Sequence, residues 1–361
     1  MKKPILLVPM SNRTNYSKIR PILLELKKEN LIDIHLVLSS SILLDQYGYA
    51  SKDIHNDGFT IQYKIDCLLN NDTLESMSKT VGLSLIEHST VNSFAQPNAV
   101  LATGDRFDML GSVLSASVMN IPIFHIQGGE ITGSVDDLIR NIISICSSKH
   151  YVSTEKSKER VAQLVGQNKE IYNFGCPAVE MVSSIPLRSR EESEYIFNTI
   201  NLSVSDKFFL IALHPNTTQK DLNMKDFMDA LHYFDYKLVF FHPNPDAFNK
   251  EILNSFKKHN IITHLPIEDF VQLMNLCSCM IGNSSAGIRE AASFGTPVVN
   301  IGLRQQNRER NKNTLDTVCE TKSIIDCVAK SLDIGKYSID NIYYKKDSAK
   351  NIAKNIMERL L

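Results

Sequence analysis

The sequence predicts an α/β protein with two doubly wound domains, each built on a parallel β-sheet, that face one another across a cleft. Three observations support this fold class. Short apolar runs alternate with helical patterns, which is typical of parallel strands joined by right-handed helical crossovers. The chain has 361 residues, more than a single hydrophobic core usually holds. A charge-rich segment that begins at Pro186 interrupts the alternation, which then restarts.

The first domain is predicted over residues 1–185. Its order of elements, strand then helix, gives repeated βαβ units. The segments are PILLVPM, a helix near residues 16–29, IDIHLVLS, an amphipathic helix over residues 73–94, NAVLATG, the helix MLGSVLSASVMN and IPIFHIQGG.

The second domain is predicted over residues 186–345 and repeats the same architecture. Its strands are expected in FFLIALHP, YKLVFFHPNPD, IITHLP, CMIGNSS and PVVNIG. The last segment, residues 346–361, contains a helix that is a candidate for crossing back onto the first domain.

Composition excludes several classes of function. Apolar residues make up 43% of the chain, charged residues 22%, and the net charge is -1, so no overall basic field exists to hold nucleic acid or an anionic membrane. No segment approaches the roughly 18 apolar residues of a membrane span. The short apolar run after Met1 is interpreted as a buried strand and not as a signal peptide.

The cysteines predict neither disulfides nor a metal site. There are seven of them, an odd number, scattered among apolar neighbours, which favours reduced thiols in a cytoplasmic protein. Cys277 and Cys279 have no second pair or histidine nearby, so no divalent metal is indicated. Neither a G-x-S-x-G nucleophile motif nor a G-x-G-x-x-G dinucleotide motif is present, so no NAD is expected.

Carboxylates gather after two neighbouring strands of the first domain. TGDRFDML presents Asp105 at a strand end, and HIQGGEITGSVDDLIRN presents Glu130 and then Asp136 and Asp137 near the start of a helix. So many like charges should raise the pKa of at least one of them, which suits proton transfer near neutral pH. The alternative interpretation is that Asp136 and Asp137 only complement the helix dipole.

The second domain carries a predicted nucleotide site in GNSSAGIREAASFGTPVVNIG. Here a strand leads through Ser284 and Ser285 into a helix, whose N-terminus favours phosphate. Glu290 is placed to reach a ribose, and Arg304 can clamp a phosphate. The simpler alternative is that the two serines only cap the helix.

Several other polar residues follow strand ends, where parallel α/β sheets bind ligands. His214 and His242 end strands in the second domain, His264 follows another, and Arg13 follows the first strand of the chain. The residues alone therefore predict carboxylate and histidine acid–base chemistry on a nucleotide-linked substrate.

At these residues the chain resembles the hydrolysing UDP-N-acetylglucosamine 2-epimerases of sialic acid synthesis. The resemblance rests on ordered motifs that span nearly the whole chain. They are NRTNYSKIRPIL, GDRFDML, NIPIFHIQGGEITGSVDDLIRN, GCP, LHPNTT, HLPIEDF and CMIGNSSAGIREAASFGTPVVNIGLRQQNRE. The resemblance implies two Rossmann-like domains in the GT-B arrangement, with the nucleotide sugar between them. It also implies a homodimer or homotetramer.

The resemblance also implies an elimination followed by an addition. The proton at carbon 2 and the UDP at carbon 1 leave to form 2-acetamidoglucal, and water then adds to release N-acetylmannosamine with inverted configuration at carbon 2. The acid–base candidates are Asp105, Glu130, Asp136, Asp137 and His214. The nucleotide-diphosphate candidates are Arg13, Ser284, Ser285, Glu290 and Arg304. Further substrate or nucleotide contacts are expected among Arg106, Arg140, His242, His264 and Asn283.

Four departures from the family pattern leave the sugar open. Asn15 replaces a usual Asp, Gln127 a common Glu, Asn141 a His, and IYYKK at residues 342–346 stands where YGDG is typical. The main alternative substrate is therefore a UDP- or GDP-linked 2,4-diacetamido-2,4,6-trideoxyhexose of the legionaminic acid pathway. A GT-B glycosyltransferase is the alternative from another class, but it would not need the cluster of acids in the first domain.

Overall fold

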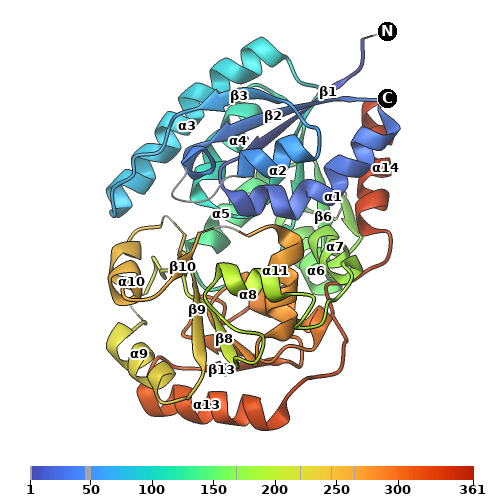
Figure 1. Ribbon diagram of the computed structural model, residues 1–361. Helices are drawn as coiled ribbons and strands as arrows, with labels where there is room; N and C mark the ends of the chain where they lie inside the picture. Colours follow the sequence, from blue (N-terminus) through green and yellow to red (C-terminus); the bar gives the residue numbers. More distant parts are fainter. Residues whose placement is uncertain (1, 45–49, 168, 220, 245, 264) are drawn as a thin grey trace. The chain divides into compact units, whose positions relative to one another are not determined.

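The computed structural model describes residues 2–44, 50–167, 169–219, 221–244, 246–263 and 265–361. The chain divides into two compact units (Figure 1). The first contains Met1–Glu130, Val135–Met181 and Tyr343–Leu361, and the second contains Ile131–Ser134 and Val182–Ile342. The boundaries between the units therefore lie a few residues before those predicted from the sequence. The short segment Ile131–Ser134 belongs to the second unit.

The first unit is built on a parallel sheet of seven strands in the order β3-β2-β1-β4-β5-β6-β7. The strands are β1 (Ile5–Met10), β2 (Asp33–Ser39), β3 (Ile61–Ile65), β4 (Ala99–Thr103), β5 (Ile123–Ile126), β6 (Lys149–Val152) and β7 (Glu170–Asn173). All residues of β1, β4, β5 and β6 are buried. A sheet covered on both faces explains why these strands appear in the sequence as nearly unbroken apolar runs.

Helices cover both faces of this sheet. They are α1 (Arg13–Glu29), η1 (Ser40–Leu43), α2 (Ala50–Asn56), α3 (Leu74–Ala95), α4 (Phe107–Val118), α5 (Val135–Cys146), α6 (Glu155–Val165), α7 (Pro177–Ser184) and α14 (Ser348–Leu360). Helix α7 runs across the change from the first unit to the second.

Alternate residues of β1 enter different cores, as the period of a strand requires. Leu6 and Val8 pack with α1 and α14, whereas Leu7 packs with residues of α4 and α5 on the opposite face. Helix α14, red in Figure 1, lies beside α1. The C-terminal helix thus belongs to the core of the first unit.

The second unit has a six-stranded parallel sheet in the order β10-β9-β8-β11-β12-β13. The strands are β8 (Phe208–Ala212), β9 (Lys237–Phe241), β10 (Ile261–Ile262), β11 (Cys279–Gly282), β12 (Val298–Ile301) and β13 (Thr314–Thr317). Its helices are α8 (Glu194–Thr199), α9 (Met224–His232), α10 (Asn249–Phe256), α11 (Ile267–Leu276), α12 (Ser285–Arg289), η3 (Ala291–Phe294) and α13 (Thr321–Ile334). Two parallel α/β sheets confirm the predicted fold class.

Every strand predicted from the sequence is present, but four strands were missed. These are β3, β6, β7 and β13. Three of them have exposed or half-buried residues, so their apolar signal is weak. Strand β6 is fully buried, yet it contains Lys149 and His150, which break the apolar pattern.

In both sheets the strand order reverses at a single point, and that point positions the candidate residues. The reversal lies between β1 and β4 in the first sheet and between β8 and β11 in the second. Ligands of open α/β sheets bind beyond the carboxyl ends of the strands at such a switch point. Among the described residues, no helix has both the length and the hydropathy needed to cross a membrane.

Gly282, at the end of β11, is a position that requires glycine. Its φ is +140°, and an added Cβ would lie 2.1 Å from the carbonyl oxygen of Ala212. We expect Gly282→Ala to lower the free energy of unfolding by about 2 to 4 kcal/mol, because strain and overpacking act together. Gly82 of α3 is a matched control with no atom within 4 Å of its added Cβ. Gly82→Ala should instead stabilise the protein by about 0.5 to 1 kcal/mol. Urea denaturation of both variants measures the difference, and equal effects would contradict it.

Candidate active site

The acid cluster of the first unit is organised around Arg140 of α5. One guanidinium nitrogen forms a close ion pair with Asp105, which follows β4. The other lies 2.7 Å from Asp137 and donates to the backbone oxygen of Glu130 at 2.6 Å. Arg140 is only 1% exposed and Glu130 is 5% exposed. The structure therefore brings together four residues that the sequence placed in two separate motifs.

Charge balance explains how a buried arginine is tolerated. Burial is the largest single effect and opposes the charge on Arg140, but the charges of Asp105, Glu130 and Asp137 and the hydrogen bond to Asp105 together outweigh it and raise the pKa of Arg140 above its ordinary value. The guanidinium is therefore a permanent positive charge that fixes two carboxylates. Both terminal nitrogens of Arg140 are therefore engaged with this cluster.

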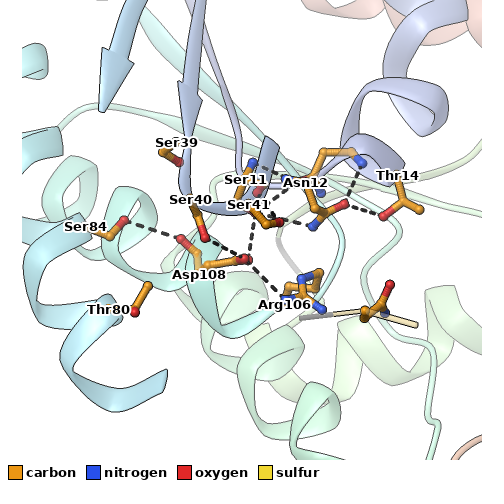
Figure 2. A network of polar contacts seen from close by, with 12 residues as sticks. Ser11, Asn12, Thr14, Ser39, Ser40, Ser41, Thr80, Ser84, Arg106 and Asp108 are labelled. Atoms are coloured by element: carbon orange, nitrogen blue, oxygen red, sulfur yellow. Dashed lines mark hydrogen bonds and ion pairs between the residues drawn. The ribbon is translucent and has the colours of Figure 1, made fainter. Parts of the chain in front are cut away.

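A second buried carboxylate, Asp108, was not singled out by the sequence analysis. Figure 2 shows it at the centre of a polar network. Its oxygens accept hydrogen bonds from Ser11 at 2.7 Å and Ser40 at 3.2 Å, and Arg106 lies 3.3 Å away. These partners follow β1, β2 and β4, so one carboxylate ties together three strand ends. The signal in the sequence was the acid at the third residue after Asp105, in the first turn of α4.

Asn15 completes the turn after β1 and accounts for one departure from the family pattern. Its side-chain oxygen accepts from the backbone of Ser11 at 3.0 Å and of Asn12 at 3.2 Å. Its amide nitrogen donates to the carbonyl oxygen of Thr103 at 3.2 Å. A carboxylate could not make that last bond. Asn15 is buried, and it joins the turn after β1 to the end of β4.

Two other departures meet at Cys176 in the first unit. Gln127 donates to the Cys176 sulfur at 3.6 Å, and the backbone amide of Cys176 donates to the oxygen of Tyr343 at 2.8 Å. The side chain of Tyr343 is fully buried in a cluster with Val179. The changes at 127 and 343 are thus structurally linked, whereas Asn141 lies on the exposed face of α5.

Arg13 begins α1 beside this network and is half-buried. Its side chain makes no hydrogen bond or ion pair with any residue in the described part of the chain. Burial alone lowers the pKa of Arg13 to about 10. A desolvated cation of this kind would be stabilised by a bound anion.

In the second unit His214 and Asn283 join the two strand ends at the switch point. The Asn283 side chain accepts from the backbone amide of His214 at 2.7 Å and donates to its carbonyl oxygen at 2.9 Å. Asn283 therefore positions the histidine. The backbone amide of Asn244 donates to Nδ1 of His214 at 3.2 Å, so the proton of the neutral ring resides on Nε2.

The predicted nucleotide residues of the second unit follow β11 and β12. Ser284 caps α12 and accepts from the backbone amide of Ala286, and Ser285 begins the helix. Arg304 donates to the backbone oxygen of Asn283 at 3.1 Å. Glu290 follows α12 as its C-cap and is partly exposed. Helix capping, the simpler interpretation, is thus observed for Ser284.

The remaining candidates are His242, Asp136 and His264. Nδ1 of His242 lies 2.8 Å from the backbone oxygen of the next residue, Pro243. Asp136 lies in the first turn of α5 beside Asp137. His264 lies outside the described residues. Across the described ranges, no group of three or more potential ligands could hold a metal ion.

Fold and site together define a two-domain α/β enzyme whose polar residues converge at the switch points of its sheets. Residues 24–357 match the family model described as UDP-N-acetylglucosamine 2-epimerase. The chain belongs to the UDP-N-acetylglucosamine 2-epimerase family.

Curated relatives extend over most of the chain. A UDP-N,N'-diacetylbacillosamine 2-epimerase (hydrolyzing) of Legionella pneumophila is 30% identical, covering 92% of this chain and 89% of the relative. A UDP-N-acetylglucosamine 2-epimerase of Neisseria meningitidis serogroup B is 27% identical over 93% and 89%. A GDP/UDP-N,N'-diacetylbacillosamine 2-epimerase (hydrolyzing) of Campylobacter jejuni is 29% identical over 88% and 85%.

Solved structures share the fold at lower identity. The UDP-GlcNAc 2-epimerase of Methanocaldococcus jannaschii, in complex with UDP-GlcNAc and UDP, matches with a TM-score of 0.81 and 18% identity over 98% of this chain and 99% of that one. The enzyme of Neisseria meningitidis bound to UDP-GlcNAc gives 0.78 and 20% over 98% and 100%. These neighbours confirm the predicted GT-B-like fold class.

The ion pairs of Arg140 predict a pH-dependent loss of stability. In Arg140→Met, Asp105 and Asp137 would remain as charges without their buried counter-ion, so we expect the free energy of unfolding to fall by about 2 to 4 kcal/mol at pH 7.5. The loss should shrink at pH 5, because uncompensated carboxylates have raised pKa values and protonation removes their charge. Arg359→Met, on the exposed face of α14, is the control. A loss that does not change with pH would count against the ion pairs.

The Asp108 network predicts a stability change without a change in shape. Asp108→Asn keeps the volume but removes the charge beside Arg106, and it replaces one acceptor by a donor. We expect a loss of about 1 to 3 kcal/mol in urea denaturation. Asp66→Asn, in an exposed position after β3, should stay within about 0.5 kcal/mol. The same small change at both positions would mean that the charge of Asp108 does not hold the network.

Proposed function

We propose that the protein is a hydrolysing 2-epimerase that converts UDP-N-acetylglucosamine into N-acetylmannosamine and UDP. The observation that carries this proposal is the group of carboxylates fixed by Arg140 at the switch point of the first sheet. A glycosyltransferase of similar fold must stabilise a leaving nucleotide, but it need not remove a proton from carbon. A cluster of acids held in place at the end of the sheet provides groups that can accept such a proton.

The chemistry requires two protic groups. The C2–H and C1–O bonds break, a C1–C2 double bond forms, and UDP leaves with the bonding electrons. Water then supplies a hydroxyl to C1, and a proton returns to C2 on the opposite face. Because the configuration inverts, the group that accepts the first proton differs from the one that donates the second. Asp105, Glu130, Asp136, Asp137 and His214 are the candidates for these roles.

Departure of UDP needs stabilisation, because the proton at carbon 2 is only weakly acidic. Arg13 supports this part of the proposal, since it is a desolvated cation without an ion-pair partner among the described residues. Arg304, Ser284 and Ser285 are the proposed diphosphate contacts in the second unit, and Glu290 is the proposed ribose contact. No metal or redox cofactor is needed for these steps.

A second substrate is favoured by two of the relatives. The Legionella and Campylobacter proteins are named as epimerases of N,N'-diacetylbacillosamine, a 2,4-diacetamido-2,4,6-trideoxyhexose. The reaction at carbons 1 and 2 would be the same, and only the groups at carbons 4 and 6 would differ. The two sugars are therefore alternatives within one mechanism.

The proposed reaction has a direct test. The purified protein in deuterated water with UDP-N-acetylglucosamine, and no acceptor, should release UDP and N-acetylmannosamine with deuterium at carbon 2, as followed by proton NMR. A parallel sample holds the UDP- or GDP-linked diacetamido sugar. Epimerisation with UDP still attached would indicate a non-hydrolysing enzyme. Persistence of all these substrates would overturn the proposal in favour of a glycosyltransferase or a nucleotide-sugar binding protein.

Two substitutions test the acid–base residues. Glu130→Gln and His214→Ala should fold normally and lower kcat by about 100-fold or more, which is typical of removing a general acid or base. Glu87→Gln and His55→Ala change the same residue types in exposed helical positions and should keep wild-type turnover. Circular dichroism checks folding. Turnover near wild type in both site variants would remove them from the mechanism.

A further inference from the structure

His125 of β5 is fully buried. It lies next to the loop after β4, which carries Asp105. We propose that His125 is a positioning residue, which holds the loop of Asp105 and the loop of Glu130 in register without exchanging protons with the substrate. This inference rests on the proposed function, because it concerns the residues assigned to acid–base catalysis. Three contacts carry it.

The first contact fixes the loop after β4. Nε2 of His125 lies 3.0 Å from the carbonyl oxygen of Gly104, the residue before Asp105. A carbonyl oxygen can only accept, so Nε2 bears the proton and donates it. Gly104 has a φ of +82°, and the bond holds the peptide that orients Asp105 toward Arg140.

The second contact fixes α5. Nδ1 of His125 lies 3.1 Å from the hydroxyl oxygen of Ser144. Because Nε2 holds the proton, Nδ1 accepts from that hydroxyl. Ser144 is buried one helical turn after Arg140, so both side chains extend from the same face of α5. The imidazole therefore bridges the same two elements that the Asp105–Arg140 ion pair joins.

The third contact involves the loop of Glu130. A Cβ added to Gly128 would lie 2.9 Å from the Ser144 hydroxyl oxygen and 3.0 Å from Nδ1 of His125. The backbone two residues before Glu130 thus rests directly on the bonded His125–Ser144 pair. The absence of a side chain at Gly128 permits this close approach, and displacement of the imidazole would remove its support.

The electrostatic surroundings keep the ring neutral. Burial is the largest effect and lowers the pKa of His125 to about 4, with Arg140 acting in the same direction. The bond to Gly104 and the charges of Asp105 and Glu130 oppose this shift only in part. His150, its neighbour on β6, is also buried and has a pKa lowered to about 3. Because the ring stays neutral near pH 7, its two hydrogen bonds can hold it in the Nε2–H tautomer, as a positioning role requires.

Three variants separate donation by Nε2 from simple packing. His125→Gln can place an amide N–H near the position of Nε2, His125→Asn reaches only the position of Nδ1, and His125→Leu has no donor. We expect Gln to retain kcat within about tenfold, and Asn and Leu to lose about 100-fold. The affinity for UDP, measured by calorimetry, should not change. Equal losses in Gln and Asn, or a fall in UDP affinity that matches the fall in kcat, would overturn the inference.

Nitrogen-15 NMR of the histidine rings tests the same inference without turnover. His125 should be a neutral Nε2–H tautomer down to pH 5, and a protonated ring or the other tautomer at pH 7 would overturn it. Carbon-13 titration of Asp105 should match wild type in the Gln variant and differ in the Leu variant, and an unchanged titration in Leu would overturn it too. These readouts remain valid if the wild-type protein turns over none of the sugar nucleotides, an outcome that would reject the proposed function alone.

Discussion

The site of the first unit depends on one compensated charge, the guanidinium of Arg140. Two carboxylates held close together would repel each other, and a lone buried arginine would be strongly destabilising. Together they form a stable group in which Asp105, Asp137 and the backbone of Glu130 take fixed positions. His125 and Ser144 support the loops around this group. Gly128 allows the backbone to approach these two side chains closely.

In both units, polar side chains join two strand ends at the point where the strand order reverses, but the residues differ. Each must join two strand ends where the order of its sheet reverses. In the first unit Asn15, in the turn after β1, donates a hydrogen bond to Thr103 of β4. Asp108 accepts a hydrogen bond from Ser40, which follows β2. In the second, both polar atoms of the Asn283 side chain are bonded to the backbone of His214. Side-chain amides suit this task because one group both donates and accepts.

Much of this architecture could be predicted from the sequence. Buried parallel strands such as VLAT and CMIG leave apolar runs that stand out, and polar residues at their ends indicate the site. The missed strands β3 and β7 are half-exposed. Strand β6 is buried, but Lys149 interrupts its apolar pattern. Asp108 and His125 were missed for another reason: they act through hydrogen bonds to residues far away in sequence, and no local pattern marks such a partner. His264, a predicted contact, lies outside the described residues, and the roles assigned to the acids stay predictions.

The return of α14 to the first unit has a consequence for how the protein is made. Ile352 and Ile356 occupy the same core as Leu6 and Val8 of the first strand. Domains commonly fold in order as they leave the ribosome, but here the N-terminal sheet lacks one covering helix until residues 348–360 have been synthesised. The second unit is complete in sequence before that point. The unit that is begun first is therefore finished last, and the apolar face that α14 covers stays without this helix until residues 348–360 have been made.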